Sequence, residues 1–189
     1  MNTFNDNTMT SSIQYPARLK LLAAIICIVT LFIPVITFGQ SRSTNDIKSN
    51  VQELNRKQIS LEPNDPWTID HIITPEELSK ELSNSKTKKP VIFHVGFDFL
   101  YKQGHIPGSI YAGPASNQQG IDILKDKVLK FKHDRDIVLY CGCCPWKYCP
   151  NIRQAYITFI ELGFTNVKVL YIADTFEKDW KDKGYSVVK

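Results

Sequence analysis

The sequence predicts an α/β fold, with a five-stranded, mostly parallel sheet flanked by helices. Segments typical of buried strands alternate along the chain with amphipathic segments typical of helices. A parallel sheet is covered on both faces, so its strands are continuous apolar runs, as at 90–95 and 136–140. No internal repeat interrupts this order, and the elements therefore predict one domain.

The first elements of the domain are a short strand and a helix. A candidate strand covers 67–70. Thr74 is then a typical N-cap, Pro75 suits the first helical position, and Glu77 completes a capping box. The apolar run 90–95 follows this helix and predicts a buried strand.

Three helices and two strands are predicted in the second half of the chain. Helices are expected over 120–132, 151–162 and 174–183, and strands over 136–140 and 167–170. Asn151 is the expected N-cap of the middle helix, and Gly163 its C-terminal stop.

Composition and charge restrict the class of protein. Of 189 residues 43% are hydrophobic and 22% charged, which excludes a disordered or low-complexity chain. The net charge of +4 is small, and no basic cluster is interleaved with aromatics, so no nucleic-acid partner is expected. Four of the five cysteines fall between positions 141 and 149. Candidate chemistry is therefore concentrated in that segment.

The N-terminal 39 residues have the pattern of a secretory signal peptide. Arg18 and Lys20 precede an uncharged run over 21–38. Thr37 and Gly39 then place small residues at the −3 and −1 positions of a cleavage site after Gly39. The sequence thus predicts a signal peptide at 1–39, a polar linker at 40–66 and the domain at 67–189. The protein is expected to be exported, with a periplasmic location. The alternative is an uncleaved membrane anchor, because such a run is near the shortest that spans a bilayer.

Cys141 is the candidate nucleophile. It follows the buried strand 136–140 and precedes a predicted helix, and ligands of open α/β sheets bind at such strand ends. The N–H groups of a helix beginning at Asn151 favour an anion in this loop. They would also lower the pKa of a thiol from its ordinary value of about 8.5.

Four motifs in this order resemble the rhodanese-like domain family. They are Gly-His-Ile-Pro-Gly at 104–108, the strand 137–141 running into Cys141, Leu-Gly-Phe-Thr-Asn-Val at 162–167, and Trp180 with 184–187. The resemblance implies the rhodanese-like fold and a sulfurtransferase without cofactor. In that mechanism Cys141 takes a sulfur atom from a small anionic donor, carries it as a persulfide and passes it to a thiol or to a cyanide-like acceptor.

The chain also departs from the family pattern. His94 and Gly96 stand where the family usually has Asp-x-Arg, and the cysteine loop is several residues longer than usual. Trp146 stands where the family has its loop arginine, which argues against a phosphatase. Lys147, Arg153 and Asn151 are therefore the candidates for binding an anionic donor. The alternative for Lys147 and Arg153 is an ordinary solvated charge.

Cys143, Cys144 and Cys149 allow other chemistry. Cys144 and Cys149 could form a disulfide that holds the loop, and Cys141 with Cys144 could form a redox pair. No metal is expected, because metal sites usually take ligand pairs from two separated segments and no second pair exists. Two classes remain: an exported sulfurtransferase, and a non-catalytic or thiol-redox module whose cysteine cluster binds a partner or metal.

Overall fold

A computed structural model of the chain describes residue 53 and residues 56–189. The expected signal peptide at 1–39 and the first part of the expected linker lie outside the described residues. Among the described helices, none combines the length and apolar character needed to cross a bilayer.

Five parallel strands form a single sheet in the order β1-β5-β4-β2-β3. The strands are β1 (Ile72–Ile73), β2 (Val91–His94), β3 (Ile110–Tyr111), β4 (Ile137–Tyr140) and β5 (Val167–Leu170). β4 is therefore the central strand, and all four of its residues are buried. The predicted five-stranded parallel sheet is confirmed.

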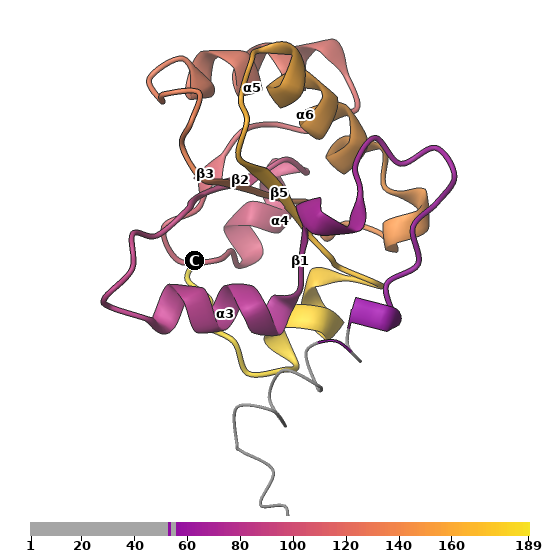
Figure 1. Ribbon diagram of the computed structural model, residues 1–189, viewed down its shortest axis with the longest axis vertical. Helices are drawn as coiled ribbons and strands as arrows, with labels where there is room; N and C mark the ends of the chain where they lie inside the picture. The colour runs from indigo at the N-terminus through magenta and orange to yellow at the C-terminus, as the bar shows by residue number, and fades with distance from the viewer. Residues whose placement is uncertain (1–52, 54–55) are drawn as a thin grey trace, which may run out of the picture. The chain divides into compact units, whose positions relative to one another are not determined.

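Helices cover both faces of the sheet. They are η1 (Ile69–His71), α3 (Pro75–Ser83), α4 (Asp98–Gln103), α5 (Gln118–Val128), η2 (Trp146–Tyr148), α6 (Pro150–Glu161) and η3 (Glu177–Lys181). α5 and α6 lie on one side of the sheet and α3 on the other (Figure 1). Along β4 the side chains alternate between two core clusters: Ile137 and Leu139 belong to the cluster with α5 and α6, and Val138 and Tyr140 to the other.

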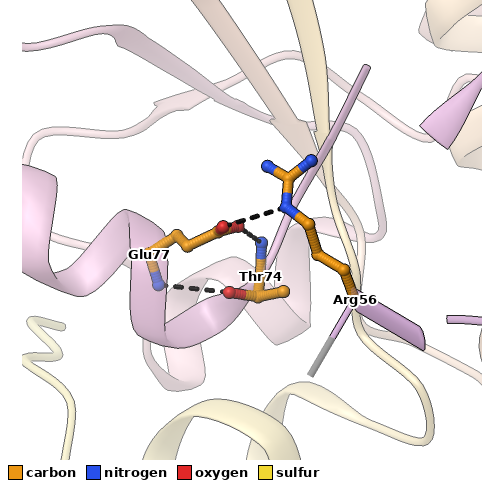
Figure 2. Close-up of polar contacts among 3 residues, drawn as sticks. All are labelled: Arg56, Thr74 and Glu77. Atoms are coloured by element: carbon orange, nitrogen blue, oxygen red, sulfur yellow. Dashed lines mark hydrogen bonds and ion pairs between the residues drawn. The ribbon is translucent and has the colours of Figure 1, made fainter. Parts of the chain in front are cut away.

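The start of α3 agrees with the predicted capping box. The Thr74 side chain accepts a hydrogen bond from the backbone N–H of Glu77 at 3.2 Å, and Glu77 Oε2 accepts one from the backbone N–H of Thr74 at 2.9 Å. Arg56 Nε also donates to Glu77 Oε1 at 3.2 Å, so a single carboxylate joins the helix start to an earlier segment (Figure 2).

The described part of the expected linker contacts the domain at further points. Ile59 packs against the core cluster of α5 and α6. Asp65 Oδ1 lies 2.6 Å from Arg153 Nη2, and the Asp65 side chain is only 1% exposed. These contacts connect the segment before Trp67 to α6.

Several predicted element boundaries were wrong. The segment 67–70 leads into the 3₁₀ helix η1, and the edge strand β1 follows it. In place of a helix over 174–183, five residues form the π-helix η3. α5 begins earlier than predicted, with Asn117 as its N-cap. α6 begins at Pro150, because proline suits the first helical position, and Asn151 is therefore not the N-cap.

Candidate functional site

The cysteine loop, residues 141–149, joins the carboxyl end of β4 to the start of α6. Its path is fixed by two backbone hydrogen bonds to the segment after β5: Phe176 N to Gly142 O at 3.1 Å, and Trp146 N to Ala173 O at 3.1 Å. Gly142 has φ +73°, and a Cβ there would lie 2.6 Å from Phe176 Cβ. A glycine is therefore required at this bend.

Four sulfur atoms converge in this loop. Cys141 Sγ lies 3.1 Å from Cys143 Sγ, which lies 3.3 Å from Cys144 Sγ. The Sγ atoms of Cys141, Cys143 and Cys149 all lie within 4.8 Å of one another. All four residues are free thiols in this structure, and a disulfide between Cys144 and Cys149 stays a prediction.

The hydrogen bonds among the thiols favour the thiolate form of Cys143 over those of its neighbours. The Cys141 thiol donates to Cys143 Sγ, and the bond from Cys149 acts in the same direction, so the pKa of Cys143 is held well below its usual range. The same bond to Cys143 raises the pKa of Cys141 to about 12. Burial raises the pKa of Cys144. The hydrogen bond between Cys149 and Cys141 raises the pKa of Cys149. Cys143 is half-buried, whereas Cys141 is 4% exposed.

Asn151 contacts the thiols from the first turn of α6. Its Nδ2 lies 3.5 Å from Cys141 Sγ and 3.7 Å from Cys143 Sγ, and its Oδ1 accepts a hydrogen bond from Ser116 N at 2.9 Å. The Ser116 contact orients the amide so that its N–H groups face sulfur. Asn151 thus belongs to the site, although not as the predicted cap.

The two predicted cationic residues have different surroundings. Lys147 is exposed in the loop, with its Nζ 5.8 Å from the centre of the Tyr148 ring. The guanidinium of Arg153 pairs with Asp65 and donates to the carbonyl oxygens of Trp146 at 3.0 Å and Cys149 at 2.9 Å. Arg153 therefore holds the loop in position, and Lys147 is the cation that faces solvent.

His94 and Gly96 lie beside Cys141, at the end of the neighbouring strand β2. A Cβ on Gly96 would lie 2.9 Å from Cys141 Sγ and 3.0 Å from the His94 ring. His94 is 3% exposed, and burial lowers its pKa to about 4, so the ring is neutral. The sequence marks both positions as departures from the family pattern but gives them no role in the site. Their place beside Cys141 follows from the pairing of β2 with β4, which the sequence does not show.

The chain was compared with known protein families and with curated protein sequences. Residues 74–171 match the sequence profile of the Rhodanese-like domain. No curated protein sequence matches the chain.

Among solved structures, the BH2092 protein from Bacillus halodurans is 19% identical with a TM-score of 0.50, covering 75% of this chain and 85% of its own. The Alr3790 protein from Anabaena sp. is 21% identical with a TM-score of 0.48, covering 61% and 81%. The first of these likenesses supports the fold, and the profile match spans more than half of the sequence. The chain therefore belongs to the rhodanese-like domain family.

Proposed function

We propose that the protein is a sulfurtransferase that carries sulfane sulfur as a cysteine persulfide in the loop between β4 and α6. The observation that carries this proposal is the position of Cys143: it is a half-exposed sulfur at the carboxyl end of the central strand and accepts a hydrogen bond from Cys141. Such an arrangement stabilises a thiolate, which is the reactive form of cysteine.

Cys143 is the better candidate for the sulfur-carrying residue. The sequence had favoured Cys141, because Cys141 directly follows the buried strand 136–140. Cys141 is buried and its thiol stays protonated, so it serves as a hydrogen-bond donor. The Cys143 thiolate attacks the outer sulfur of thiosulfate, the donor's S–S bond breaks, and sulfite leaves with the electron pair. A thiolate or cyanide acceptor then removes the outer sulfur and regenerates the Cys143 thiolate. Cys141 and Asn151 stabilise that leaving charge.

Lys147 is proposed to attract the anionic donor. It is an exposed cation within the cysteine loop, and a charge near the mouth of a site raises the local concentration of an oppositely charged ligand. Lys147→Ala should raise KM for thiosulfate several-fold and leave kcat nearly unchanged. Lys130→Ala, which removes a cation near Phe131, is the control and should change neither constant.

Intact-protein mass spectrometry tests the main proposal. Reduced protein incubated with thiosulfate should gain one sulfur atom, which peptide analysis should locate on Cys143. Cyanide should remove it and form thiocyanate. Cys143→Ser should abolish both steps. Sulfur found on Cys141 would restore the assignment from sequence, and no sulfur uptake at all would refute the sulfurtransferase.

A thiol-redox module is the second candidate. The 3.1 Å between the Cys141 and Cys143 sulfurs favours it, because a small movement would bring them to disulfide distance. Mass spectrometry of the protein as isolated, without reductant, distinguishes the two. A disulfide that forms reversibly, together with no sulfur uptake after reduction, would support the redox module.

We further propose that the protein is exported and acts on small molecules, without a nucleic-acid partner. The sequence pattern of 1–39 supports export, and cleavage after Gly39 would give a mature chain beginning at Gln40. The small net charge of +4 supports the absence of a nucleic-acid partner. N-terminal sequencing of the fractionated native protein is the test. An intact Met1 in the membrane fraction would show an anchored protein instead.

A further inference from the structure

We propose that Cys141, Cys143 and Cys149 form a binding site for monovalent copper. Their Sγ atoms all lie within 4.8 Å of one another, and this is the one group of potential metal ligands found in the described part of the chain. The proposal goes beyond sulfur transfer and is independent of it, because it requires only that three sulfurs converge.

The spacing of the sulfurs suits a bound ion. Three sulfurs that each lie about 2.3 Å from one ion in a trigonal plane are about 4.0 Å apart. Here the Cys141 and Cys143 sulfurs are 3.1 Å apart and every pair lies within 4.8 Å, so small shifts of the side chains would give that arrangement. A cavity of about 10 Å³ adjoins the cluster; Cys141, Cys144 and Cys149 line it, and Cys143 lies outside the lining. That volume is close to the space of a single small atom or water.

The donor set selects a soft ion. All three ligand atoms are sulfur, and no carboxylate or imidazole belongs to the group, which argues against magnesium, calcium and manganese. Structural zinc takes four ligands in a tetrahedron, whereas monovalent copper is stable with three thiolates. Cys144 Sγ is 3.3 Å from Cys143 Sγ but does not belong to the mutually close group. Three sulfurs therefore point to copper.

The surroundings can stabilise the charge of the complex. Cys143 is the thiolate of the resting site, and the Cys141 and Cys149 thiols lose their protons to solvent as Cu⁺ binds. Three thiolates and one Cu⁺ give a unit with two negative charges. The Asn151 amide lies within 3.7 Å of two of the sulfurs and donates toward them. The N-terminus of the 12-residue helix α6 follows directly and favours negative charge.

The folded loop also removes the sequence argument against a metal. That argument required two ligand pairs from separated segments. Here Cys149, which follows η2 in the same loop, has its Sγ within 4.8 Å of those of Cys141 and Cys143, so no second segment is needed. A single loop therefore supplies the complete donor set.

A competition titration of the full chain tests the proposal. The reduced protein is titrated anaerobically with Cu⁺ against bicinchoninate, and copper is expected to bind at one ion per chain. X-ray absorption should show a shell of three sulfurs and no nitrogen or oxygen ligand. Cys141→Ser, Cys143→Ser and Cys149→Ser should each weaken binding at least about 100-fold. Circular dichroism of each variant checks that the fold is kept.

A further variant makes the test specific. Cys144→Ser should change the affinity less than about 10-fold, because that sulfur lies outside the three-ligand group. If Cys144→Ser abolishes binding and the protein retains Zn²⁺ in preference to Cu⁺, the site is a four-sulfur zinc site and the copper assignment is wrong. Binding that survives loss of Cys141 or Cys149 would also overturn it. Sulfur uptake from thiosulfate is a separate measurement, so failure of either proposal leaves the other intact.

Discussion

His94 is a buried imidazole whose effect on stability depends on pH. Its folded-state pKa is about 4, against 6.5 for the ordinary group. Between these values the unfolded chain binds a proton that the folded protein excludes, so the free energy of unfolding falls as the pH falls from 6.5 to 4. The shift corresponds to about 3 kcal/mol. Above pH 6.5 neither state holds the proton, and the group contributes no pH dependence.

His94→Phe should remove this dependence. Phenylalanine suits the aromatic surroundings, which include Tyr140 with its ring centre 5.0 Å from that of His94. Urea unfolding at pH 7 and pH 4.5 should show a smaller loss of stability for the variant than for wild type. His133→Gln, at an exposed histidine, is the matched control. Equal losses in wild type and His94→Phe would show that His94 is already protonated in the folded protein.

Single residues of the site were predictable where position along the chain decides their surroundings. Cys141 follows a buried strand, so its place at the carboxyl end of the sheet could be inferred. The partners of Arg153 could not, because Asp65 lies far away in sequence and inside a segment expected to be a linker. The lowered pKa of Cys143 also required coordinates, since it depends on which sulfurs touch.

The capping box of α3 gives a prediction for one helix. Thr74→Ala removes the side chain that accepts from the N–H of Glu77, and an N-cap loss of this kind costs about 1 kcal/mol of stability. Urea denaturation should show that decrease. Ser83→Ala, at the exposed end of the same helix, is the control and should change stability by less than about 0.5 kcal/mol. An equal effect of both substitutions would show that the cap contributes nothing.

Element length decided which strands the sequence could predict. The runs 90–95 and 136–140 contain β2 and β4, because three buried positions in a row in β2 and four in β4 produce a clear apolar signal. β1 and β3 have two residues each, too few for any period to be visible, and β3 was not predicted. The helix α4 was not predicted for the same reason, because its six residues are too few to show a helical period.

The segment before Trp67 contributes to the stability of the whole domain. Both core clusters consist of buried residues from Trp67 onward, so a chain starting at residue 67 should still unfold cooperatively. It lacks Asp65, however, and Arg153 at 20% side-chain exposure is left without its carboxylate. Compared with a chain starting at residue 56, we expect a loss of about 3 kcal/mol.

Thermal and urea unfolding of the two shortened chains provide the measurement. Asp65→Asn in the longer chain isolates the ion pair and should reproduce most of the loss. If the two chains are equally stable, residues 56–66 act only as a linker. Absence of cooperative unfolding in the shorter chain would show that this segment is essential to the fold.

The order of the strands in the sheet was not predicted and comes from the structure. Alternating strands and helices predict a parallel sheet, but many orders satisfy that rule. The motifs at 104–108 and 162–167 indicated the family, and the match over 74–171 confirms it. The lengthened cysteine loop had no counterpart in the family pattern, so its path could be known only from coordinates.

All four clustered thiols come from one contiguous loop, and none from the strands beside it. Such chemistry can be inherited or lost as a unit, because an insertion or deletion between β4 and α6 changes every sulfur at once and leaves the sheet intact. Only a few anchors lie outside the loop, among them Phe176 against Gly142 and Ser116 behind Asn151. Another domain of this fold into which the loop is transplanted would need these contacts as well. With them, the loop could be transferred between domains as one unit.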